Sequence, residues 1–186
     1  MKKMEYKGKH GTLTLDRDGP LGYKPEVYCE ALNLGGKLTA DNVQTLLKWK
    51  SPRWLSPKSD KAEKVLEHLD KINSFRADRN TELDSFFGGG SVYDVFIKHI
   101  ARPAEYPIYD NHVLNAYCRL EKGLADGLSV KTCKKMYDEY RDFFFRAYAA
   151  VFGTDERKND LETVRKMKAL DTALMEYDKA HEKNKA

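Results

Sequence analysis

The chain has 186 residues, of which 41% are hydrophobic and 33% are charged, and its formal net charge is +4. This composition is typical of a globular domain and excludes an intrinsically disordered chain. No run approaches the roughly 20 apolar residues that a membrane span needs, and the N-terminal lysines precede no apolar run, so we expect neither a membrane span nor a secretory signal. The cysteines are scattered, which predicts no disulfide framework and a cytoplasmic location; they are Cys29, Cys118 and Cys133.

Residues 1–38 are the least regular part of the sequence, and we expect a short irregular N-terminal extension there. Residues 12–15 alternate polar and apolar side chains and precede turn residues at 16–20, which predicts a short strand or hairpin at most. Residues 25–32 fit one short helix that ends before Gly35 and Gly36.

From Thr39 onward the apolar residues recur at helical spacing, which predicts an all-α fold. We expect one helical domain over residues 39–178, followed by a polar tail over 179–186 that frays. The expected helices begin at Thr39 as N-cap, at Ser59 or Asp60, at Thr81, after Ser91, near Asn111, at Ser129 and near Asp160. The helix from Thr81 is expected to be short and to end at Phe87, and the helix from Ser129 is expected to end at Gly153.

Basic residues and two tryptophans alternate over residues 48–64. Lysines and arginines can clamp phosphates, and tryptophans can stack on bases, so this segment is a candidate nucleic-acid surface. The alternative interpretation is a solvated helix end whose tryptophans, Trp49 and Trp54, point into the core.

Two features of the central segment could carry chemistry. Gly88, Gly89 and Gly90 let the backbone approach another surface closely, and the N–H groups that follow Ser91 favour a phosphate. Asp110 precedes a predicted helix, where backbone N–H groups would cap its carboxylate and hold its pKa low. Taken singly, the glycines could be a tight helix–helix turn and Asp110 a simple N-cap.

Taken together, these features resemble the helix-hairpin-helix superfamily of DNA glycosylases. The glycines after Phe87 stand in the position of the hairpin, and the run Tyr106-Pro-Ile-Tyr-Asp-Asn-His-Val113 stands in the position of the catalytic aspartate. The resemblance implies that Gly88, Gly89, Gly90 and Ser91 bind the backbone of double-stranded DNA, with a possible monovalent cation on the hairpin carbonyls. It also implies that Asp110 is the catalytic carboxylate for excision of a modified or damaged base.

The resemblance also predicts what this chain lacks. Family members that cut the strand carry a lysine near position 92, but Ser91 and Val92 are not amines and Lys98 lies more than a turn further on. The iron–sulfur cysteines of some members are missing after residue 149. We therefore expect a monofunctional enzyme without lyase activity, iron–sulfur cluster or other metal.

The remaining candidates follow by analogy. Lys50, Arg53 and His112 are candidate DNA contacts, although His112 could equally serve local structure. Trp49, Trp54 and Tyr109 are candidates for the base pocket, whereas His99 falls on an apolar helix face and is expected in the core. Two other classes stay open: a non-catalytic nucleic-acid-binding module and a helical protein-interaction domain.

Overall fold

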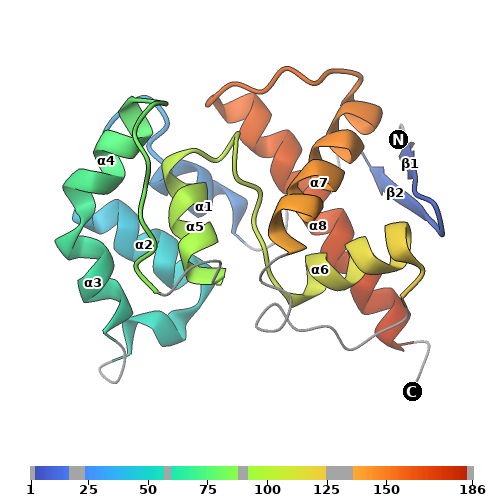
Figure 1. The fold of residues 1–186 in the computed structure, drawn as a ribbon, viewed down its shortest axis with the longest axis horizontal. Coiled ribbons are helices and arrows are strands. Elements are labelled where there is room, and N and C mark those ends of the chain that lie inside the picture. Colours follow the sequence, from blue (N-terminus) through green and yellow to red (C-terminus); the bar gives the residue numbers. More distant parts are fainter. Residues whose placement is uncertain (1–2, 17–23, 57–59, 88–91, 125–135, 184–186) are drawn as a thin grey trace.

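The computed structural model describes residues 3–16, 24–56, 60–87, 92–124 and 136–183, and these are mostly helical. Two lobes lie side by side (Figure 1), each around its own apolar core. The first lobe contains α1 (Pro25–Ala31), α2 (Ala40–Lys50), η1 (Pro52–Leu55), α3 (Lys61–Glu67), α4 (Leu69–Ala77) and α5 (Val92–Ala101). The second contains β1 (Lys3–Lys7), β2 (Thr12–Asp16), α6 (Asn111–Tyr117), η2 (Cys118–Lys122), α7 (Tyr137–Phe152) and α8 (Leu161–Lys183).

The N-terminal strands form an antiparallel hairpin that belongs to the second core. Tyr6 pairs with Leu13, and the buried side chains of both join the cluster around α6, α7 and α8. The turn is closed by a 2.8 Å hydrogen bond from the Gly8 N–H to the Gly11 carbonyl. The predicted strand is therefore confirmed, but its partner precedes it instead of following it. The segment is part of the core, not an extension beside it.

Local start and stop signals place several helices as predicted. Thr39 accepts a hydrogen bond from the Asn42 N–H, and the Asn42 side chain accepts one from the Thr39 N–H, which is a complete capping box for α2. Gly153 ends α7 with a φ of 69°, a left-handed conformation that glycine adopts without strain. The predicted start of α7 at Ser129 lies outside the described residues.

The expected helix over residues 81–87 is not present. The carboxylate of Asp94, in the first turn of α5, accepts hydrogen bonds from the Phe86 and Phe87 N–H groups at 2.8 and 3.1 Å. It also accepts one from the Ser85 hydroxyl at 2.9 Å. The two backbone N–H groups are therefore bonded to a side chain seven and eight residues away. The single helix expected from Ser59 or Asp60 is divided into α3 and α4, which meet at His68.

Among the described helices α8 is the longest, with 23 residues, and it contributes side chains to both cores. Val164 packs in the first core, whereas Leu170 and Leu174 pack in the second. The helix continues to Lys183, so the tail expected to fray from residue 179 is still helical there. Among the described helices, none combines the length and the apolar character that crossing a membrane requires.

His99 is the core histidine that the sequence predicted, only 3% exposed. Its Nδ1–H donates to the Tyr106 carbonyl at 2.6 Å, and the Tyr28 hydroxyl donates to Nε2. Burial lowers the pKa of His99 to about 3, and this effect outweighs the opposing one of the Tyr106 carbonyl. The imidazole is therefore neutral, and its two bonds join α1 to the loop that follows α5.

We predict that His99 makes the free energy of unfolding fall in mild acid. Between pH 6.5 and the folded pKa, the unfolded chain binds a proton that the folded chain does not. Stability therefore decreases as pH falls, by about 2 kcal/mol between pH 6.5 and 5. Urea unfolding of wild type and His99→Gln at pH 7 and pH 5 tests this, with a smaller loss expected in the variant. Equal losses in the two proteins would contradict the assignment.

Candidate functional site

The carboxylate of Asp110 lies at the seam between the two lobes. Its Oδ1 accepts hydrogen bonds from the His112 and Val113 N–H groups at 3.1 and 3.2 Å, which caps α6 as the sequence predicted. Its Oδ2 lies 2.8 Å from the Nζ of Lys50, the last residue of α2. The side chain of Asp110 remains 32% exposed, against 13% for Lys50. One carboxylate thus begins a helix of the second lobe and pairs with a cation of the first.

These contacts keep Asp110 ionised. Burial alone would raise the pKa of the carboxyl, but the charge and hydrogen bond of Lys50 and the Val113 N–H outweigh it. The pKa of Asp110 is lowered to about 2, which confirms the low value expected for a capping aspartate. At neutral pH the group is a carboxylate, able to accept hydrogen bonds or to stabilise a nearby positive charge.

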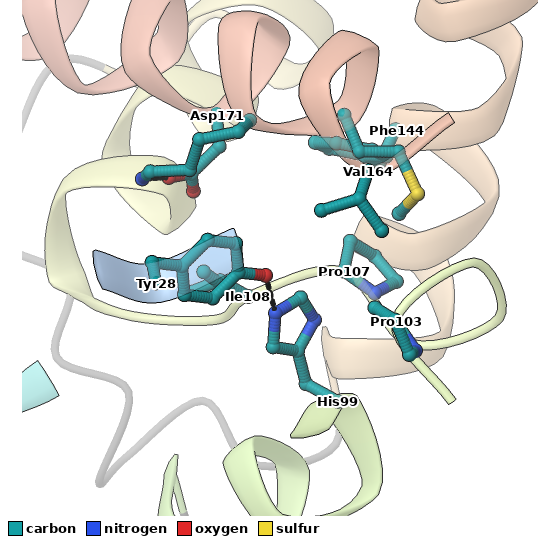
Figure 2. A pocket seen from close by; sticks show the side chains of 10 residues that line it. Tyr28, His99, Pro103, Pro107, Ile108, Phe144, Val164 and Asp171 are labelled. Carbon is teal, nitrogen blue, oxygen red and sulfur yellow. Dashed lines mark hydrogen bonds and ion pairs between the residues drawn. The ribbon is translucent and has the colours of Figure 1, made fainter. Parts of the chain in front are cut away.

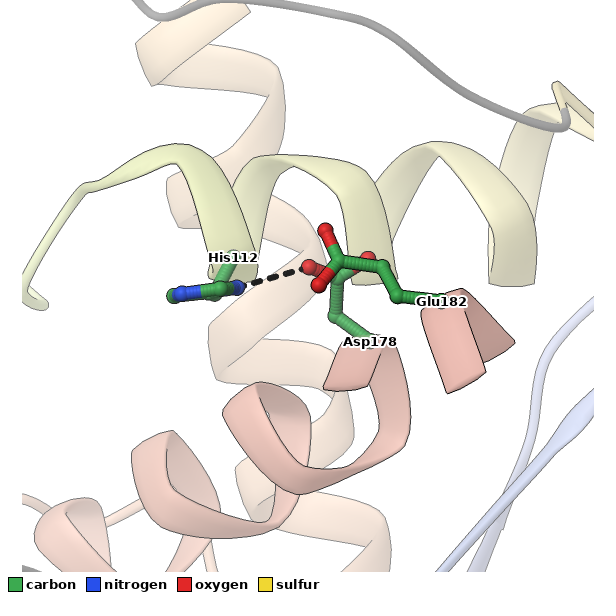
Figure 3. Close-up of side chains that lie close together, drawn as sticks. All are labelled: His112, Asp178 and Glu182. Carbon is green, nitrogen blue, oxygen red and sulfur yellow. Dashed lines mark hydrogen bonds and ion pairs between the residues drawn. The ribbon is translucent and has the colours of Figure 1, made fainter. Parts of the chain in front are cut away.

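His112 is bonded to a buried carboxylate, that of Asp178, which the sequence did not identify (Figure 3). Its Nδ1 lies 2.8 Å from Oδ2 of Asp178, which is fully buried, while the His112 side chain is 38% exposed. The Arg119 Nη2 lies 3.3 Å from the other oxygen of Asp178. Because Asp178 binds Nδ1, Nε2 is the ring nitrogen left for an outside partner. Asp178 therefore orients His112 beside Asp110.

Glu182 completes a group that could hold a metal ion. His112, Asp178 and Glu182 each offer one ligand atom, and these atoms lie within 4.8 Å of one another. Asp178, however, is already shared by His112 and the guanidinium of Arg119, a positive charge that opposes a cation. Within this group, Asp178 is the member that positions His112.

A small cavity of about 10 Å³ lies near the seam, between Tyr28, His99 and α8 (Figure 2). That volume is about the space of one water. Asp171 lines it, is 7% exposed and pairs with Lys168, but its Oδ1 is buried without a hydrogen bond. Asp110 lines neither this cavity nor a second, larger pocket in the first lobe.

The other predicted site residues differ in how far they are exposed, and some of them lie outside the described residues. Trp49 is half-buried, 4.6 Å from Tyr28 between ring centroids. Tyr109 is fully buried and stacks among the tyrosines of α7, so it contributes to the core. Arg53 is exposed on η1. Gly88, Gly89, Gly90, Ser91 and the side chain of Trp54 lie outside the described residues.

The chain was compared with known proteins at three levels. No protein-family model matches it, and neither a curated protein nor a solved structure does.

We predict that Asp178 is structurally essential and that Glu182 is not. Asp178→Ala would remove a fully buried carboxylate that pairs with both His112 and Arg119, and we expect a loss of about 3–5 kcal/mol in the free energy of unfolding. Glu182→Ala removes an exposed side chain at the end of α8, and we expect a change within about 0.5 kcal/mol. Urea unfolding of both variants measures the difference. Similar losses would show that the two carboxylates act as one unit, contrary to the assignment.

Proposed function

We propose that this chain is a monofunctional DNA N-glycosylase that excises a modified or damaged base. The observation that carries the proposal is the ionised, partly exposed carboxylate of Asp110 at the seam between two lobes. Lys50 beside it offers positive charge for a DNA phosphate, and His112 presents Nε2, which donates to a phosphate when the ring carries both protons. The sequence motifs that resemble the helix-hairpin-helix glycosylases assign the same aspartate to catalysis.

In this proposal Asp110 acts on a nucleotide that has left the double helix. The N-glycosidic bond is unreachable inside a duplex, so the nucleotide must first be flipped out of the stack. As the bond to the base breaks, the sugar gains positive charge, and a nearby carboxylate stabilises that charge or activates a water. The backbone N–H bonds of Asp110 fix one oxygen, so little reorganisation is needed as the charge develops.

The remaining roles are proposed from the sequence. The imidazolium form of His112 would donate from Nε2 to a phosphate, and Arg53 and Lys50 would extend the contact along the backbone. The glycines 88–90 with Ser91 would bind phosphate through main-chain N–H groups, with a possible monovalent cation on their carbonyls. Trp49, whose ring lies 5.0 Å from the Lys168 Nζ of α8, and Trp54 would contribute to holding the base.

We predict that Asp110→Asn abolishes excision without unfolding the protein. Asparagine keeps a capping oxygen but loses the negative charge, so we expect at least a hundredfold slower release of the base. The matched control is Asp160→Asn, because Asp160 caps α8 through the Thr163 N–H and is exposed. Purified proteins are incubated with duplexes that carry a panel of lesions, and abasic sites are revealed by alkali.

Three outcomes would contradict this proposal. Wild-type protein could leave every lesion intact, or Asp110→Asn could excise as fast as wild type. Strand breaks that form without alkali, and that disappear in Lys50→Gln, would instead assign lyase chemistry to the amine beside Asp110.

A second candidate function is a DNA-binding module without catalysis. The observation that favours it is the ion pair itself, because Lys50 already occupies one oxygen of Asp110. In this case Asp110 would hold the lobes together while the basic residues bind duplex DNA. The module would bind duplexes with strong salt dependence and would produce no abasic site on any substrate.

We predict that Arg53 contributes one phosphate contact under either function. Arg53→Gln should lower the slope of log affinity against log salt by about 0.9. The matched control is Lys7→Gln, an exposed cation on β1 in the other lobe, which should leave the slope unchanged. Fluorescence anisotropy with an undamaged duplex measures both, and equal slopes for Arg53→Gln and wild type would remove Arg53 from the interface.

A further inference from the structure

The larger pocket in the first lobe has no role in the proposed DNA chemistry. Its volume is about 360 Å³, within the range of sites that bind small molecules. It lies between α4, the end of α5 and the loop that joins α1 to α2, and Asn159 lines it from the segment before α8. Leu34, Ala77 and Pro103 supply apolar lining.

The charged lining of this pocket is entirely positive. Lys37 and Arg76 line it, and no aspartate or glutamate does. Arg76 makes no ion pair with the described residues, although burial lowers the pKa of its guanidinium. Charged groups that leave water are ordinarily paired with an opposite charge. A half-buried guanidinium without a carboxylate partner therefore favours an anion beside it.

The hydrogen-bonding groups of the pocket point to the same kind of ligand. Arg76 donates to the carbonyls of Leu32, Asn33 and Ile100 at 2.8, 2.6 and 3.1 Å. These bonds use three of the five N–H groups of a guanidinium, which fixes the side chain and leaves two for a ligand. The Asn159 Oδ1 accepts from the Ala104 N–H, which leaves its amide nitrogen as a further donor.

We propose that this pocket binds a small organic anion, whose carboxylate or phosphate group pairs with Arg76 and Lys37. The fixed guanidinium supplies planar donors, exposed Lys37 supplies a second positive charge, and the apolar lining contacts the body of the ligand. The proposal does not depend on DNA excision, because none of these residues belongs to the Asp110 site.

The test measures binding of inorganic phosphate by calorimetry, with sodium chloride adjusted to constant ionic strength. Lys37→Gln should weaken phosphate binding about tenfold or more, because a charged hydrogen bond is lost. The matched control is Lys71→Gln, an exposed lysine on α4 outside the pocket, which should bind as wild type. Arg76 is left unchanged because its three carbonyl bonds support the lobe.

A second variant reverses the charge at the same exposed position. Lys37→Glu places a negative charge in the lining of the pocket. We expect this variant to lose phosphate binding and to keep the circular dichroism spectrum and the melting temperature of wild type.

Each remaining outcome would overturn the proposal. Wild type could bind phosphate no better than chloride, or Lys37→Gln and Lys71→Gln could weaken binding equally. Lys37→Glu could fold and still bind phosphate as wild type. An undamaged duplex could also displace phosphate, with Lys37→Gln weakening duplex and phosphate binding to the same degree. That result would assign the pocket to a DNA backbone phosphate instead of a small molecule. Failure of excision by Asp110 changes none of these readouts.

Discussion

The bonds of Asp110 join the two halves of the molecule. One oxygen binds the N–H groups that begin α6, and the other binds Lys50 at the end of α2. A helix needs its first N–H groups satisfied, and a partly buried carboxylate needs a counter-charge, so both requirements are met by one side chain. The same bonds that stabilise the seam keep the group anionic, which is the property that the proposed chemistry requires.

Short-range signals in the sequence predicted much of the helical structure. Helix α2 is capped by Thr39 and α6 by Asp110, and α7 ends at Gly153. Each residue acts on backbone groups only a few residues away, so these roles can be inferred from the local sequence pattern. The prediction of a helix from Thr81 was wrong for the opposite reason. Its capping pattern is local, but Asp94 binds Phe86 and Phe87 from the next helix, and this tertiary contact prevails.

The candidate site was predictable only in part. Asp110 and His112 follow from a motif, but their partners Lys50 and Asp178 lie 60 and 66 residues away in the sequence. In the sequence, Lys50 is an ordinary basic residue of a helix end, and Asp178 is the last residue before the expected polar tail. Asp178 reaches His112 through the packing of α8 against α6. Lys50 reaches Asp110 through the contact between the lobes.

The two lobes share one rigid element. α8 contributes Val164 to one core and Leu174 to the other, and its 23 residues extend for about 34 Å at the rise of an α-helix. Neither core can lose its structure without uncovering a side of this helix. We therefore expect a single cooperative unfolding transition and, in hydrogen exchange, the slowest amides of the chain along the middle of α8.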